Sequence, residues 1–153
     1  MQNSYPEESR WKRVFPARYE SLEAVRQMVG EAAQECGLKN AAVYAVEMAV
    51  DEAFTNIIEH AYLGESDEEI TLACEIEKDQ LVIFLRDCGR PFNPDEIPAP
   101  DVNAPLEERQ VGGLGLFFMR NLMDEVNFSF KSEEAGVDNC NVLRMVKRKE
   151  RSG

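Results

Sequence analysis

Positive charge is scarce in this sequence, and it is absent from residues 46–62. The 153 residues include 17 Lys and Arg against 29 Asp and Glu, which gives a formal net charge of −12. This charge argues against nucleic acid or an anionic membrane as the main partner, and it is compatible with a basic or mixed protein partner. A nucleotide is not excluded, because backbone N–H groups and a metal ion can hold phosphates.

Zinc-binding and targeting signals are also missing. Cys36, Cys74, Cys88 and Cys140 are widely spaced without a C-x-x-C pair, and His60 is the only histidine, so we expect no structural zinc site. No apolar run approaches a membrane span or a signal peptide, which predicts a cytoplasmic protein with reduced thiols and no membrane partner. Only Cys88 lies inside a candidate motif. As a free thiol it can be structural or redox-sensitive, and we interpret it as structural.

The hydrophobic pattern predicts a single domain at residues 11–148, with a flexible tail at 1–10 and a short tail at 149–153. The predicted strands are 11–17, 69–78, 80–86, 126–130 and 141–147, and the predicted helices are 19–36, 40–62 and 112–123. Strands and helices are grouped and do not alternate strictly, so we expect an α+β fold, a two-layer sandwich of helices on a mostly antiparallel sheet. The long, proline-rich connection at about 91–111 is typical of a functional lid.

The helix at residues 46–62 has two different sides. At 100° per residue its apolar side chains gather on one broad face, while Glu52 and Asn56 lie one turn apart on the other side. A solvated face would normally carry Lys or Arg, so we expect this polar stripe to face something other than bulk water. The pair is either ordinary surface polarity, or one residue holds a metal or a water while the other takes a proton.

Two further motifs are weak when each is taken alone. Gly112-Gly113-Leu114-Gly115 enters a helix, where free N–H groups and the helix dipole suit a phosphate, although such glycines are often structural. It is neither a Walker A motif nor a dinucleotide G-x-G-x-x-G. Asp87-Cys88-Gly89 follows a predicted strand and can be a simple turn. It can also offer a hydrogen-bond acceptor to an exocyclic amine, with room for a flat ring at Gly89.

The order of these motifs resembles the GHKL ATP-binding superfamily, with its histidine-kinase-like fold, and most closely the anti-sigma-factor serine kinases of the RsbW type. The likeness covers about residues 14–147. It is carried by DEAFTNIIEHAY at 51–62, DCGRPFNP at 87–94 and GGLGLFFMRNLMDEV at 112–126.

This resemblance implies ATP and Mg²⁺ as cofactors and assigns roles by position. Asn56 would hold Mg²⁺, Glu52 would be the general base for a serine hydroxyl, and Asp87 would bind the adenine amine with Gly89 beside the ring. The remaining nucleotide contacts that it implies are Phe92, Arg109, Gly112, Gly113, Leu114, Gly115 and Leu116. Residues of about 91–111 would form the ATP lid.

Three positions depart from the family pattern or stay open. A threonine is often found in the last strand near the adenine, whereas this chain offers Cys140 or Asn141 there. Arg109 is the candidate lid cation, with a solvated lid charge as an equal alternative. His60 lies in the first motif, two turns from Glu52, where a packing or hydrogen-bonding role is favoured over catalysis.

The resemblance further implies a homodimer with two kinds of protein partner, a sigma factor that is sequestered and a STAS-domain anti-anti-sigma protein that is phosphorylated on serine. An alternative is a module that binds ATP or ADP and sequesters partners without kinase turnover, although a pure binder has no need for Glu52. A free-standing ATPase and a sensor histidine kinase are disfavoured, because the sequence lacks a transducer domain and an upstream helix pair with a phosphoacceptor histidine.

Overall fold

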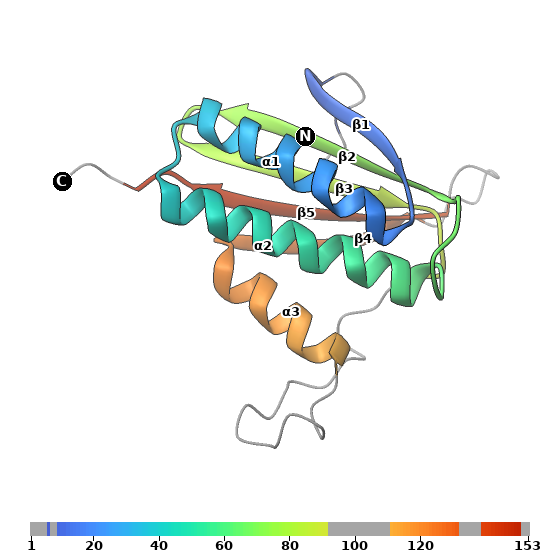
Figure 1. The fold of residues 1–153 in the computed structure, drawn as a ribbon. Helices are drawn as coiled ribbons and strands as arrows, with labels where there is room; N and C mark the ends of the chain where they lie inside the picture. Colours follow the sequence, from blue (N-terminus) through green and yellow to red (C-terminus); the bar gives the residue numbers. More distant parts are fainter. Residues whose placement is uncertain (1–5, 7–8, 92–110, 132–138, 151–153) are drawn as a thin grey trace.

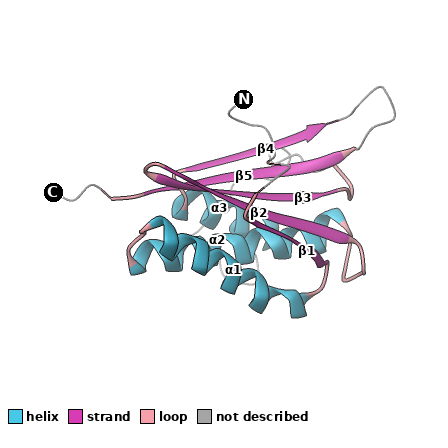
Figure 2. Ribbon diagram, turned by 90° about the horizontal axis from the view of Figure 1, so that it is seen from above, coloured by secondary structure: helices cyan, strands magenta, loops and turns pink. Residues whose placement is uncertain are grey.

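The structure, a computed structural model, describes residues 6, 9–91, 111–131 and 139–150. They form two layers, a five-stranded sheet and three helices that cover one face of it (Figures 1 and 2). The expected α+β sandwich is therefore confirmed. Among the described residues, no helix has the length and apolar character needed to cross a membrane.

Every strand pairing in the sheet is antiparallel. The spatial order is β1-β2-β3-β5-β4, so the last strand of the chain lies between β3 and β4. The strands are β1 (Trp11–Pro16), β2 (Glu69–Glu77), β3 (Gln80–Asp87), β4 (Glu125–Lys131) and β5 (Cys140–Arg148).

The strand pattern follows from burial. The hairpin of β2 and β3 closes with Glu77 opposite Gln80, so residues 78 and 79 form its turn. In β3 the run from Leu81 to Leu85 is buried on both faces, which explains why its sequence is continuously apolar. In β2 the alternating residues face the helices, although Ile76 near the strand end is exposed. Pro16 ends the edge strand, where its missing N–H costs no ladder hydrogen bond.

Three helices form the second layer. A short 3₁₀ turn (η1, Tyr19–Ser21) leads into α1 (Leu22–Cys36), which stops at Gly37 in a left-handed conformation with φ of 93°. The long central helix consists of α2 (Asn40–Asn56) and a π-helical turn, η2 (Ile57–Ala61). The third helix is α3 (Val111–Leu122), which packs on α2. The predicted helices are present, and the π-helical turn is an addition.

The main core lies between the helices and the sheet. The predicted apolar face of the central helix is buried as expected, and its largest side chain, Phe54, meets Phe15 of β1 edge-on with ring centroids 6.3 Å apart. The other residues of this face are Val43, Val46, Val50, Ala53, Ile57 and Ala61. The central helix is therefore a fixed base for whatever its opposite side carries.

One expectation about the cysteines is wrong. Cys88, after β3, and Cys140, at the start of β5, form a disulfide, so Cys88 is not a free thiol. Cys36 and Cys74 are free and buried. The pair could not be seen in the sequence, because 52 positions separate the two residues and only the pairing of β3 with β5 brings them together.

Several expectations fall outside the described residues. These are most of the N-terminal tail, the C-terminal residues 151–153, and the lid residues 92–110 with Phe92 and Arg109.

Phe54→Ala should lower the free energy of unfolding by about 3–5 kcal/mol, because it leaves a cavity under the central helix. Urea denaturation followed by circular dichroism measures this change. Tyr44→Ala is the control on the same helix, since Tyr44 is 64% exposed and should change the free energy little. Equal losses of unfolding free energy in both variants would contradict the division of the helix into a buried and an exposed face.

Candidate functional site

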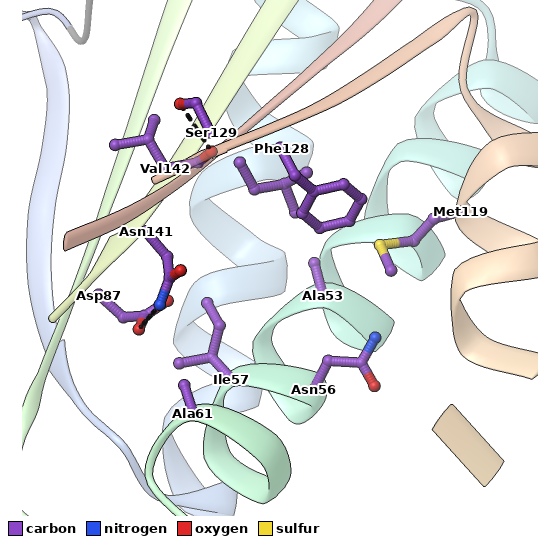
Figure 3. A pocket seen from close by; sticks show the side chains of 11 residues that line it. Ala53, Asn56, Ile57, Ala61, Asp87, Met119, Phe128, Ser129, Asn141 and Val142 are labelled. Atoms are coloured by element: carbon purple, nitrogen blue, oxygen red, sulfur yellow. Dashed lines mark hydrogen bonds between the residues drawn. The ribbon is translucent and has the colours of Figure 1, made fainter. Parts of the chain in front are cut away.

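A pocket that is partly open to solvent lies between α2, α3 and the sheet (Figure 3). Two predicted site residues line it, Asn56 from α2 and Asp87 from the end of β3, and Asn141 of β5 is a third polar residue there. The rest of the lining is mostly apolar: Ala53, Ile57, Ala61, Met119, Phe128, Ser129, Val142 and Leu143. Apolar walls with a few convergent polar groups are typical of a small-molecule site.

Asp87 is the buried polar end of this pocket, with only 4% of its surface exposed. Its Oδ1 accepts hydrogen bonds from Asn141 Nδ2 at 2.9 Å and from the Gly89 backbone N–H at 3.0 Å. Burial raises the pKa of Asp87, while these two donors oppose the rise by stabilising the carboxylate. Both donors use the same oxygen, so within the described residues Oδ2 has no donor and can accept one from a ligand.

Asn141 answers the question that the last strand left open. It is the residue that reaches Asp87, and Figure 3 shows the two side chains pointing toward each other, whereas Cys140 is held in the disulfide. Asn141 Nδ2 also donates to the Arg90 carbonyl at 2.9 Å. One amide group therefore orients both the carboxylate and the segment that follows it.

Glu52 and Asn56 meet α3 at Gly115. A Cβ atom built on Gly115 would lie 2.9 Å from Glu52 Oε2 and 3.5 Å from Asn56 Oδ1. The lack of a side chain at Gly115 leaves room for the carboxylate end of Glu52 in its present position. The structure thus brings together the first and the last of the predicted motifs, with Asn56 shared between this corner and the pocket.

The electrostatic surroundings of Glu52 are unfavourable to its charge. Partial burial is the main cause that raises its pKa, and the negative charges of Asp51 and Glu59 add to it. Asp51 itself turns to α1, where Arg26 Nη1 donates to it at 2.6 Å. A carboxylate with a raised pKa binds a proton more readily at neutral pH, which suits a general base.

The remaining predicted glycine-box residues lie in α3. Gly112, Gly113 and Leu114 belong to its first turn, where backbone N–H groups have no partner inside the helix. Leu116 is buried in the main core. The roles of these residues as nucleotide contacts stay predictions.

Gly89 fits against the π-helical turn. A Cβ atom there would lie 2.6 Å from the Ala61 carbonyl oxygen, so this position is closed to any side chain. The next residue, Arg90, donates its backbone N–H to the same carbonyl at 2.9 Å. Gly89 therefore couples the end of β3 to the central helix, in addition to its predicted place beside a flat ring.

Two supporting residues were not singled out from the sequence. Tyr62 Oη donates to the Glu69 carbonyl at 2.8 Å and accepts from the Cys88 N–H at 3.0 Å. Arg90 Nε donates to the His60 carbonyl at 3.2 Å. His60 Nε2 is buried without a hydrogen bond among the described residues. The available signal was their place in the quoted motifs, Tyr62 at the end of the first and Arg90 inside DCGRPFNP.

The residues present fit an adenine nucleotide with Mg²⁺. The pocket offers apolar walls for a flat ring and an acceptor at Asp87 for an exocyclic amine. The Asn56 amide oxygen is a suitable ligand for Mg²⁺, which takes its other oxygens from phosphates and water.

Comparison with known proteins agrees with this geometry. Residues 15–147 match the model of the histidine kinase-like ATPase domain, so the chain belongs to that family. It is 35% identical over 120 residues to the serine-protein kinase RsbW of Listeria monocytogenes, covering 76% of each chain. It is 33% identical over 136 residues to RsbW of Halalkalibacterium halodurans, covering 86% of this chain and 78% of that one. Within the ATPase domain family, the chain is a member of the RsbW serine-protein kinases.

A solved structure supports the fold independently. The RsbU and RsbW domains of a Mycobacterium tuberculosis protein match with a TM-score of 0.60 at 16% identity, over 90% of this chain and 31% of that one. At this identity the match bears on the fold alone, which it confirms.

Gly89→Ala and Gly115→Ala should differ sharply in stability. The new methyl group at residue 89 meets backbone, so we expect a loss of about 1–3 kcal/mol in the free energy of unfolding. At residue 115 it meets the movable end of Glu52 and gains helix propensity, so stability should hold or rise while Glu52 is displaced. Urea midpoints of the two variants test this, and an equal loss in both would contradict the contacts described.

Glu52→Gln should stabilise the nucleotide-free protein at neutral pH. Because the folded state raises the pKa of Glu52, the unfolded chain ionises first, and stability falls as pH rises through the folded pKa. The uncharged amide avoids this loss. Parent and variant should therefore differ least below the ordinary glutamate pKa of about 4.3 and most near neutrality. Urea midpoints across this range measure the difference, and a variant that is less stable at neutral pH would refute it.

Proposed function

We propose that this protein is a Mg-ATP-dependent serine kinase and anti-sigma factor. It phosphorylates a serine on a STAS-type anti-anti-sigma protein, and it sequesters a sigma factor when that antagonist is phosphorylated. The observation that carries the proposal is the corner where Glu52 and Asn56 lie against Gly115, beside a pocket that ends at Asp87. The nearness of these three side chains supports roles for them as base, cation ligand and adenine acceptor.

Each residue has one task in this mechanism. Bound Mg-ATP supplies the phosphoryl group and the cation that neutralises its charge. Asp87, oriented by Asn141, accepts the exocyclic amine and fixes the register of the base. Asn56 holds the cation through its amide oxygen, and the first turn of α3 offers backbone N–H groups to the phosphates. Glu52 accepts the proton of the attacking serine hydroxyl.

The partners come from the family. The relatives named above are serine-protein kinases, which supports a protein hydroxyl as the acceptor. Phosphorylation adds roughly −1.5 to −2 charge to the antagonist. This chain already carries a net charge of −12, so the modified partner is repelled and released. We also propose that the protein is cytoplasmic and forms a homodimer.

A second function is a module that binds nucleotide and sequesters partners without transfer. The placement and raised pKa of Glu52 favour the kinase. A module that only binds nucleotide gains nothing from a partly buried carboxylate beside the proposed phosphate site. The two functions differ in one measurable product, phosphoserine on the antagonist.

Glu52→Gln should lower phosphoryl transfer by about 100-fold or more while ATP affinity is kept, because the amide cannot accept a proton. Single-turnover transfer from radiolabelled ATP to a purified STAS-domain antagonist measures the rate, and calorimetry measures ATP affinity. Glu47→Gln is the matched control, since Glu47 lies on the same helix but on the side facing Gly30 of α1. It should transfer at the parent rate.

Two variants separate binding from chemistry in the same assay. Asp87→Asn should weaken ATP binding by about 10-fold, the worth of one hydrogen bond to a charged group, and Asn56→Ala should remove the Mg²⁺ dependence of binding. If the parent binds ATP and captures partners but leaves no phosphoserine, the binding module is correct. If Glu52→Gln transfers as fast as the parent, the base is another residue.

A further inference from the structure

The disulfide lies at the edge of the nucleotide pocket. In the register of β3 and β5, Asp87 is opposite Asn141, so Cys88 and Cys140 are the next pair toward the end of the strands, with Cα atoms 4.1 Å apart. Each cysteine is therefore the chain neighbour of one partner in the Asp87–Asn141 hydrogen bond. No other cysteine lies near this pair, because Cys36 is on α1 and Cys74 is buried in β2.

The contacts around the bond converge on the same carboxylate. Gly89, directly after Cys88, donates to Asp87 Oδ1, and Asn141, directly after Cys140, donates to that oxygen and to the Arg90 carbonyl. The Cys88 N–H is held by Tyr62 Oη. The disulfide thus covalently closes the strand end from which both donors to Asp87 within the described residues come.

The two cysteines of the disulfide differ in reactivity from the two free cysteines. Cys88 is exposed and Cys140 is buried, so the bond has one side that is open to a small thiol. The free cysteines are poorly suited to exchange, because burial raises the pKa of Cys36 and raises that of Cys74 to about 12. Oxidation and reduction are therefore directed to the pair beside the pocket.

We propose that Cys88 and Cys140 form a reversible thiol–disulfide site that sets nucleotide affinity, with low-molecular-weight thiols and their disulfides as reactants. The inference rests on the nucleotide site of the proposed function. In reduction, a small thiolate attacks one sulfur, forms a mixed disulfide and leaves the other cysteine as a thiol. A second thiolate then releases the small disulfide, so two electrons enter the bond and each cysteine sulfur gains a proton. Oxidation by the small disulfide is the reverse.

The oxidised state binds nucleotide more tightly. With the bond closed, the backbones on both sides of Asp87 are fixed before the ligand arrives, so binding does not have to order them. After reduction the strand end is held only by hydrogen bonds and can open locally. A protein in a reducing compartment would hold nucleotide weakly, and oxidation would strengthen its hold.

The test measures ATP affinity by calorimetry with Mg²⁺ in glutathione buffers of defined ratio. Alkylation and intact mass of the same samples count the free thiols, four in the reduced chain and two in the oxidised one. We expect affinity to fall by about 3- to 10-fold on reduction, in step with the loss of the bond. Cys88→Ser and Cys140→Ser should each match the reduced parent in every buffer. Cys36→Ala, which leaves the pair intact, should respond as the parent does.

The outcomes distinguish failure of the redox switch from failure of the proposed kinase function on which it rests. Equal affinity in both redox states, a response that survives Cys88→Ser and Cys140→Ser, or a pair that never forms in an oxidising glutathione buffer would overturn the switch and leave the kinase proposal standing. If neither state binds ATP, the proposed function fails, and the switch fails with it.

Discussion

Asp87 accepts two hydrogen bonds at a single carboxylate oxygen, and the arrangement of the site depends on that pairing. A carboxylate this deeply buried is costly without donors, so the fold must deliver Asn141 from β5 and the Gly89 amide from the adjoining turn. The same turn fixes Arg90 against the Ala61 carbonyl of η2. The polar end of the pocket is in this way tied to the central helix that carries Glu52 and Asn56.

The central helix joins two requirements that usually conflict. Its buried face contributes several fully buried side chains to the core, which holds it rigidly on the sheet. Its other side carries a partly buried carboxylate whose pKa is raised, a feature that costs stability in the absence of ligand. A catalytic group that lowers the stability of the fold needs a rigid element to hold it in place. The packing of Phe54 on Phe15 is part of what makes the central helix rigid.

The local parts of this arrangement were readable from the sequence, and the non-local parts were not. Alternation in β2, the continuous apolar run of β3 and the two-sided helix all follow from the periodicity of neighbouring residues. The disulfide and the Asn141–Asp87 hydrogen bond both depend on the register of β3 against β5, strands more than fifty residues apart. The contact of Gly115 with Glu52 depends on how closely α3 approaches α2, which no spacing of residues encodes.

The π-helical turn imposes a constraint of length on the chain. The Tyr62 amide donates to the Ile57 carbonyl five residues earlier, at 3.0 Å, so the helix holds more residues in this turn than an α-helix would. Without that surplus, the Ala61 carbonyl would rotate away from the Arg90 amide, and Tyr62 would no longer reach Cys88. The contacts of this turn therefore depend more on the number of residues between Asn56 and Tyr62 than on their identity. Insertions or deletions there should be rarer among functional relatives than substitutions.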